Sequence, residues 1–192
     1  MKKKITLLLT LLSILACIFF IKDSYAKYIT SRNESTNLTV ARWRILVNNN
    51  DIRNSNTTNT VITPVFDGTD NIKEGIIAPT SEGYFDLIID ATEADVSFKY
   101  KIDLSVNENS IVKDLIATKY TINNGEEITL DRDNQTIENT VLRVNNTSVI
   151  NIRVFIKWDD GENATMDNVQ DTQATNTGTA KMNVNLTFTQ VN

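Results

Sequence analysis

The chain contains no histidine and a single cysteine, Cys17. Without histidine it cannot build an H-E-x-x-H zinc site, a Ser-His-Asp triad or any imidazole metal site. Because Cys17 lies within an apolar N-terminal stretch, the rest of the chain has no thiol nucleophile, no thiolate zinc site and no disulfide. We therefore expect no enzyme of those classes and no cofactor, and a fold held together by its apolar core.

The N-terminus has the pattern of a secretory signal peptide. Lysines at positions 2–4 precede an uncharged apolar stretch over 5–21, and Ser24 and Ala26 are the small residues at −3 and −1 of a cleavage junction. We expect cleavage between Ala26 and Lys27, which gives a signal peptide over 1–26 and a single mature domain over 27–192. The mature protein is then extracellular or on the cell surface, and only the leader contacts the membrane, before cleavage.

Two other interpretations of the leader stay open. The stretch Ile14–Cys17 resembles a loose lipobox, which would make Cys17 a lipidated N-terminus, although an apolar stub would then follow the lipid. The apolar stretch is also close to the lower limit of about 17–25 residues for a retained membrane anchor. Cleavage after Ala26 is the favoured interpretation. The C-terminal stretch 190–192 carries no sorting motif, so no attachment is expected there.

The chain is acidic, with a formal net charge of −5 at pH 7. Removing the leader takes away four lysines and one aspartate, so the mature chain is more negative still. Such a surface repels nucleic acid and anionic polymers and keeps an exported protein soluble. Nucleic acid is therefore not an expected partner.

Alternation of apolar and polar residues with a period of two dominates the mature chain and predicts half-buried strands. The expected strands are 41–47, 60–66, 84–90, 96–104, 118–123, 136–144, 150–158 and 182–188. Turn-forming residues such as Asn48–Asp51 and Asn123–Gly125 separate them. The pattern predicts an all-β fold, a single jelly-roll-like β-sandwich of about eight strands. A 3.6-residue period predicts one short helix near 109–117.

Carboxylates are the remaining candidates for site chemistry. Five acidic residues gather in the polar stretch 159–179, namely Asp159, Asp160, Glu162, Asp167 and Asp171. The favoured interpretation is a solvated acidic loop and not a glycosidase-like pair. Asp131 and Asp133 are candidate calcium ligands, as are Asp159 and Asp160, but Thr136 stands where an EF-hand requires glycine. Trp43 and Trp158 follow the apolar faces of their strands and are expected in the core.

Three stretches carry a family resemblance. They are the leader junction with the first strand, 25–28 and 40–45; the lead-in and strand 77–87; and the closing part, 156–158, 171–172 and 184–190. In these the chain resembles the TasA/camelysin-type secreted proteins of Gram-positive bacteria, which are exported by a SipW-like signal peptidase. It departs from them at Pro79-Thr80, where the family often has Pro-Gly, and in a leader poorer in glycine. Some members are described as metallopeptidases, an activity that a histidine-free chain is not expected to share.

The resemblance implies a structural subunit of a biofilm matrix or cell-surface fibre. Its partners would be further copies of itself, other matrix proteins, and a SipW-like signal peptidase during export. The segment 27–38, which includes Tyr28, Ile29 and Leu38, is a candidate donor strand that would complete a neighbour's sheet. Two alternatives stay open: a monomeric adhesin or ligand-binding module, and a carboxylate-based hydrolase or atypical peptidase.

Overall fold

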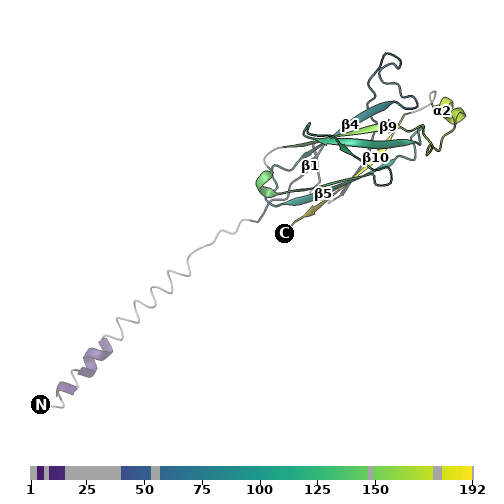
Figure 1. Cartoon of the computed structure of the whole chain (residues 1–192). Coiled ribbons are helices and arrows are strands. Elements are labelled where there is room, and N and C mark those ends of the chain that lie inside the picture. Colours follow the sequence, from purple (N-terminus) through teal and green to yellow (C-terminus); the bar gives the residue numbers. More distant parts are fainter. Residues whose placement is uncertain are drawn as a thin grey trace. The chain divides into compact units, whose positions relative to one another are not determined.

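The computed structural model describes residues 4–6, 9–15, 40–52, 57–146, 149–174 and 179–191. The chain divides into two units, Met1–Val40 and Ala41–Asn192. In the first unit, residues 4–6 and 9–15 are helical. None of the helices in the described ranges is long and apolar enough to cross a membrane. The second unit is built almost entirely of strands (Figure 1).

The second unit contains ten strands, one α-helix and one short 3₁₀ helix within its described residues. The strands are β1 (Leu46–Val47), β2 (Asn50–Asp51), β3 (Thr57–Ile62), β4 (Glu82–Asp90), β5 (Phe98–Val106), β6 (Leu115–Ile122), β7 (Ile128–Thr129), β8 (Thr136–Val141), β9 (Ile150–Trp158) and β10 (Met182–Gln190). The helices are η1 (Arg143–Asn145) and α2 (Asn168–Ala174). The expected strands 84–90, 96–104, 150–158 and 182–188 agree closely with β4, β5, β9 and β10.

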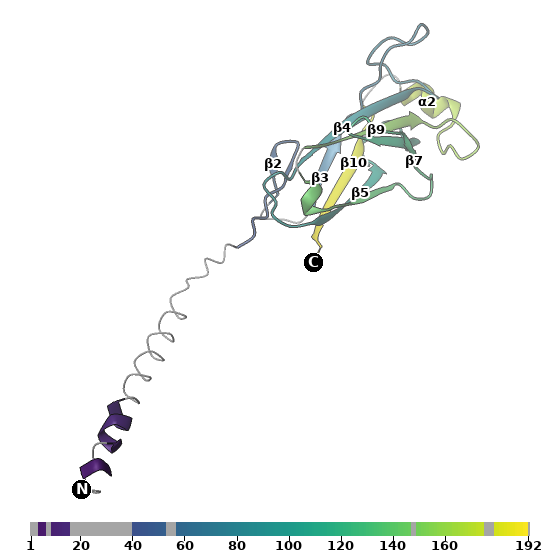
Figure 2. The ribbon, with the colours of Figure 1, turned by 60° about the vertical axis from the view of Figure 1, so that its left-hand side comes forward.

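The strands form two antiparallel sheets. One has the order β2-β1-β4-β9-β6-β7 and the other the order β3-β10-β5-β8. From β3 to β10 the pairing is nested, since β3 pairs with β10, β4 with β9, β5 with β8 and β6 with β7. A chain folded back on itself in this way and wrapped into two sheets is a jelly roll. Figure 2 shows β3, β10 and β5 side by side in the four-stranded sheet. The predicted all-β sandwich is confirmed.

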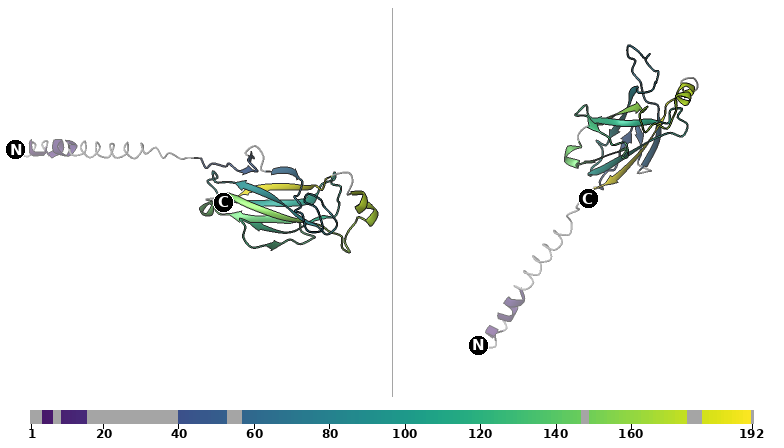
Figure 3. Two further views of the ribbon diagram at one scale, coloured as in Figure 1. Left: turned by 90° about the horizontal axis from the view of Figure 1, so that it is seen from above. Right: turned by 45° about the vertical axis from the view of Figure 1, so that its right-hand side comes forward.

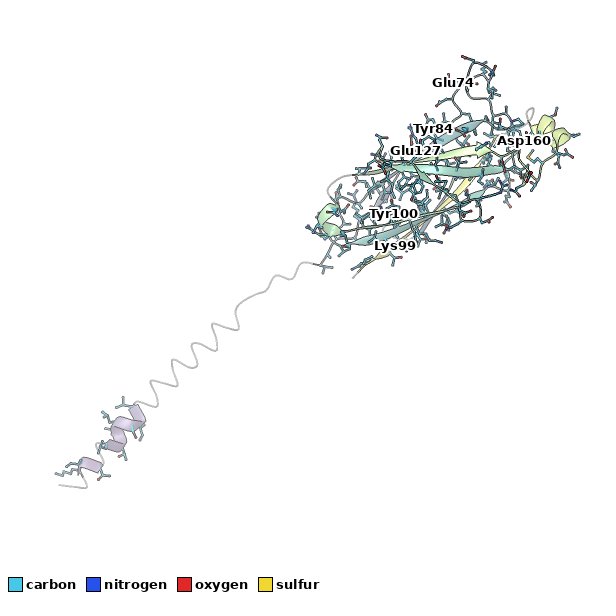
Figure 4. The ribbon with its side chains drawn as sticks, viewed as in Figure 1. Glu74, Tyr84, Lys99, Tyr100, Glu127 and Asp160 are labelled. Atoms are coloured by element: carbon cyan, nitrogen blue, oxygen red, sulfur yellow. The ribbon has the colours of Figure 1, made fainter. Side chains whose placement is uncertain are left out.

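The core lies between the sheets because apolar side chains occupy alternate positions on the facing strands. Along β5, Phe98, Tyr100 and Ile102 are fully buried, while Lys99 and Lys101 face outward. Figure 4 shows Tyr100 on the side of β5 toward the other sheet. Each large aliphatic or aromatic side chain buried in this way contributes about 1.5–3 kcal/mol. The core alone therefore supplies the main stabilising term.

Both tryptophans pack with the core, as expected, Trp158 inside it and Trp43 partly buried against it. Trp158 at the end of β9 is 1% exposed. Trp43 packs edge-on against Phe98, with ring centroids 6.2 Å apart and an interplanar angle of 85°. That geometry is one that aromatic pairs prefer. Both rings therefore take part in packing.

The asparagine-rich turns have the backbone conformation that their residues suggest. Asn48 and Asn49, between β1 and β2, have φ of 47° and 67°, and Asn123 and Asn124, after β6, have φ of 52° and 56°. Asparagine tolerates this left-handed region better than most residues. Two consecutive residues with positive φ form the type of turn that suits the twist of a hairpin.

The helix predicted near 109–117 is wrong. Residues Asn107–Asp114 form turns and bends that cross between β5 and β6, and Leu115 already begins β6. Ser110 is buried and its hydroxyl donates to the Val112 carbonyl at 2.7 Å. The 3.6-residue apolar pattern arises because Val112 and Leu115 enter the core from a bent connection. Tertiary packing thus overrides the local period.

The α-helix lies elsewhere, in the acidic stretch. Asp167 precedes α2, and its Oδ1 accepts hydrogen bonds from the backbone N–H groups of Val169 (3.0 Å) and Gln170 (2.9 Å). The Gln170 side chain accepts in return from the Asp167 N–H at 2.9 Å. This is a capping box, and its residues are visible in the sequence. In Figure 3, α2 lies at one end of the sandwich and the C-terminal end of β10 at the opposite end.

Candidate functional site

The residues predicted for export and assembly lie outside the described ranges. Ala26 and Lys27 at the cleavage junction belong to residues 16–39, and so do Tyr28, Ile29 and Leu38 of the candidate donor strand. The nearest described part of the folded unit is the segment that begins at Ala41. Any surface that receives a donor strand or a ligand would lie on the folded unit.

The segment after Ala41 is fixed to the sandwich by Arg42. Its backbone N–H and its Nε donate to Oδ2 of Asp95 at 2.9 and 3.0 Å, and its Nη2 donates to Oδ1 at 3.0 Å. The Asp95 N–H in turn donates to the Arg42 carbonyl at 2.9 Å. The Arg42 side chain and backbone lower the pKa of Asp95 to about 2. The beginning of the folded unit is therefore fixed to the loop before β5.

Two of the four candidate calcium ligands, Asp131 and Asp159, are used by the protein itself. Oδ1 of Asp131 accepts the Asp133 N–H at 3.0 Å, which closes the turn between Asp131 and Asn134. Asp159 forms an ion pair with the Arg132 guanidinium. Arg132 also donates from Nη2 to the Asn163 carbonyl at 3.1 Å. The two candidate loops are thus brought together, but the Arg132 guanidinium and not a metal ion joins them.

Among the described residues, no group of three or more acidic, histidine or cysteine side chains is arranged to hold a metal ion. Asp133 and Asp160 are exposed on their turns. Hard cations require several converging oxygens. The geometry therefore offers no support for calcium at Asp131, Asp133, Asp159 or Asp160.

A buried carboxylate that the strand pattern did not single out organises the acidic stretch. Asp114 is 7% exposed and accepts hydrogen bonds from the Thr165 hydroxyl (2.6 Å) and from the N–H groups of Thr165 (2.8 Å) and Met166 (2.7 Å). Burial by itself raises the pKa of Asp114, but these hydrogen bonds outweigh it, so the pKa is lowered overall. Asp114 is thus a structural clamp and already has its partners.

Asp171 on α2 has the opposite electrostatic environment. It is buried, and its Oδ1 has no hydrogen-bond partner. Burial raises its pKa, and the nearby carboxylates of Asp160, Asp114 and Asp167 raise it further. The acidic stretch is therefore partly folded, unlike the solvated loop that its composition suggests.

The outer face of the six-stranded sheet carries two aromatic rings, each covered by a cation. Arg153 lies over the Tyr84 ring at 4.1 Å and is paired with Asp86, while Lys119 lies over the Phe155 ring at 4.9 Å. Figure 4 labels Tyr84 together with Glu127, which is paired with Lys119. Both rings are half-buried and each has a cation over it, so both take part in contacts within the sheet itself.

The edges of the two sheets differ in how they are protected. Edge strands β2 and β7 of the larger sheet are two residues long. Edge strand β8 carries Glu138, which is paired with Lys99 at 2.7 Å. Short length and charge are devices by which proteins prevent strand addition.

Edge strand β3 has none of these devices. It pairs with β10 in continuous register over six residue pairs, and β10 is the one described strand beside it. Its sequence, Thr57-Thr58-Asn59-Thr60-Val61-Ile62, has no charge, proline or glycine, and Val61 is 53% exposed. Thr60 faces the interior opposite Val184, yet it is exposed. The candidate acceptor edge is therefore the outer edge of β3.

No protein-family model and no curated protein matches this chain.

Proposed function

We propose that this chain is a secreted structural subunit that polymerises by β-strand addition, as the TasA/camelysin-type resemblance implies. The segment Lys27–Leu38 of one copy would be the donor strand, and the outer edge of β3 in the next copy the acceptor. The observation that carries the proposal is the unprotected edge of β3, which is the longest uncharged edge among the described strands. On an edge strand, the N–H and C=O groups that point away from the sheet are a template for a further strand, and the proposed acceptor is residues 58–62 of β3.

The lengths are compatible with this pairing. A donor of twelve residues extends over roughly 40 Å at about 3.3 Å per residue, whereas β3 has six residues. About half of the donor could pair with β3 while the rest spans the gap between copies. Because donor and acceptor are different surfaces, the contact is heterologous and propagates into filaments. The Arg42–Asp95 attachment gives the donor a fixed origin.

One local feature supports the family resemblance without depending on assembly. Thr80 has a φ of 70°, in a turn closed by the Ser81 N–H donating to the Ala78 carbonyl at 2.9 Å. This left-handed position is one that glycine occupies without strain. The Pro-Gly that the family often has at this place suits the observed turn.

The test compares two exported forms, one beginning at Lys27 and one beginning at Val40. We expect fibres from the first and monomers from the second, by electron microscopy and size-exclusion chromatography. Thr60→Lys places a charge on the interior side of the β3 edge and should slow fibre formation about tenfold or more. Thr140→Lys on the other edge, β8, is the matched control and should assemble normally.

Equal melting midpoints of the two lysine variants would show that both remain folded. Fibres from the chain beginning at Val40 would contradict the donor assignment. Loss of assembly in Thr140→Lys, but not in Thr60→Lys, would contradict the acceptor assignment. Closed dimers of the Lys27 form, without filaments, would indicate that two β3 edges pair with each other and would contradict the proposed polymerisation.

A further inference from the structure

Met166 joins the acidic stretch before α2 to the crossing between β5 and β6, at the end of the sandwich where Figure 1 shows α2. Its backbone N–H donates to Oδ2 of Asp114 at 2.7 Å, and its Sδ accepts the Lys113 N–H at 3.1 Å. Lys113 and Asp114 are neighbours in the crossing. Met166 is therefore attached to one short segment both by its backbone and by its thioether.

Met166 also borders a cleft that small molecules can enter. The residue is half-buried, and the cleft of about 310 Å³ beside it is lined by Ile111 of the crossing and by Gln170, Gln173 and Ala174 of α2. The side chains of Ile111 and Ala174 are apolar and have no hydrogen-bonding group. Hydrogen peroxide is only slightly larger than a water molecule, and the cleft exceeds by far the volume that one water needs.

The other methionines are placed differently. The sequence contains three, namely Met1, Met166 and Met182. Met182 begins β10, is 1% exposed and belongs to the core. Met1 lies outside the described ranges. The one cysteine, Cys17, belongs to the N-terminal apolar stretch, so the folded unit has no thiol that would compete for an oxidant. Susceptibility to oxidation follows exposure, which favours Met166 over Met182.

Peroxide oxidises a thioether by oxygen transfer. A lone pair of the sulfur attacks one peroxide oxygen, the O–O bond breaks, and the proton of the transferred oxygen passes to the other oxygen, which leaves as water. The sulfur is oxidised to the sulfoxide and the peroxide is reduced. A flexible apolar side chain thereby becomes polar and chiral.

The sulfoxide cannot keep the contact with Lys113. An oxygen added on the side of the Lys113 N–H has no room, because nitrogen and sulfur are only 3.1 Å apart. An oxygen added on the opposite side makes the sulfur the positive end of the S–O dipole, which repels the N–H. Both epimers therefore lose this contact, and the new polar group lies beside the apolar Ile111 and Ala174.

We propose that Met166 is an oxidation site for hydrogen peroxide, and that its sulfoxide loosens the attachment of the stretch 159–174 to the crossing between β5 and β6. The change is reversible, because methionine sulfoxide reductases reduce the two epimers back to methionine. The β3 edge and the segment 27–38 take no part in it. The proposal therefore does not depend on polymerisation.

The first experiment compares the methionines within one chain. The folded chain is exposed to limiting hydrogen peroxide at neutral pH, and each methionine is followed by peptide mass spectrometry. We expect Met166 to be oxidised at least about tenfold faster than Met182, and both at similar rates in urea. Equal rates in the folded chain would overturn the site. A tenfold difference that persists in urea would come from the local sequence and would overturn the role of the cleft.

The second experiment measures the loosening by amide hydrogen exchange. After oxidation, the N–H groups of Thr165 and Met166 that bond to Asp114 should exchange about tenfold faster, while those of the central strand β9 stay unchanged. Treatment with the reductases should restore slow exchange. Met166→Leu has an apolar side chain of similar volume without sulfur, so peroxide should not alter its exchange. Met182→Leu is the matched control and should respond to peroxide as the parent does.

Three results would contradict the loosening. One is unchanged exchange at Thr165 and Met166 in the oxidised parent. Another is an equal increase in Met166→Leu after peroxide, which would place the effect at a different residue. The last is faster exchange throughout β9 as well, which would mean that oxidation opens the whole sandwich. The comparison of the parent before and after oxidation needs no variant, so it decides the question even if Met166→Leu is less stable.

Discussion

Asp95 receives three hydrogen bonds from Arg42, two of them from the guanidinium and one from the backbone. The two residues are far apart in the sequence and join the segment before β1 to the loop before β5. Because the contact includes a backbone N–H, it fixes the path of the chain as well as the side chain.

We expect Asp95→Asn to lower the melting midpoint at neutral pH. The pKa of Asp95 is held at about 2, below the unfolded value of about 3.9, so its stabilising effect is present above pH 4 and is lost as the pH falls toward 2. The variant should therefore lose part of that pH dependence. Melting curves between pH 1.5 and 5, with Glu93→Gln as the control, measure it. If the melting midpoints of Asp95→Asn and the parent changed with pH in the same way, the Arg42–Asp95 contact would not contribute to stability.

Asp114→Asn should destabilise the fold by about 1–3 kcal/mol, since it weakens the charge-assisted bonds to Thr165 and Met166 inside a buried site. The lowered pKa of Asp114 means that its contribution is present above the unfolded value and disappears as the pH falls below it. Urea unfolding at pH 7 and pH 3 checks both statements. Thr165→Val, which removes one of the three donors, should have a smaller effect at pH 7. If Asp114→Asn were as stable as the parent at pH 7, the hydrogen bonds of the Asp114 carboxylate would not stabilise the fold.

Asp171→Asn is expected to stabilise the protein at neutral pH. The raised pKa of Asp171 means that the folded state resists its ionisation, so stability is lost as the pH rises from the unfolded value through the folded one. The amide removes this loss, and the gain should vanish at low pH. Thermal melts of the variant and parent at pH 3 and pH 7 test the sign. A gain of equal size at both pH values would point to packing instead of charge.

Thr80→Gly should stabilise the turn before β4 by about 1 kcal/mol. A side chain in the left-handed region costs about 1–2 kcal/mol, and the glycine relieves this at some entropic cost in the unfolded chain. Chemical unfolding of the variant provides the measurement. Thr92→Gly, in a turn where no positive φ occurs, is the control and should be neutral or destabilising. Destabilisation by Thr80→Gly would mean that the threonine side chain makes a compensating contact.

The sequence pattern was most informative where one face of a strand is buried. Over 150–158 the alternation predicts β9 with its bounds, because Ile152, Val154 and Ile156 all enter the core. It was least informative at the edges. The two-residue strands β2 and β7 are too short for a period, and β3 is mostly threonine and asparagine. The expected strand 60–66 therefore begins too late and extends into the bridge at Val65.

The two buried carboxylates could not be predicted from the sequence, for a related reason. Asp114 and Asp171 look like surface acids in the sequence, and only the crossing between β5 and β6 and the packing of α2 bury them. The capping box Asp167–Gln170 was the one local signal that could have located α2.

The nested pairing also sets the order in which the sandwich can form. Ile62 of β3 pairs with Met182 of β10. Strand β3 therefore cannot pair with β10 until nearly the whole domain has been synthesised. Closing so long a loop is entropically costly and slow. A ribosome-bound or partly translocated chain would thus hold β3 unpaired, and the edge proposed for assembly would exist only once β10 has emerged. The proposed polymerisation could therefore begin only after the fold is complete.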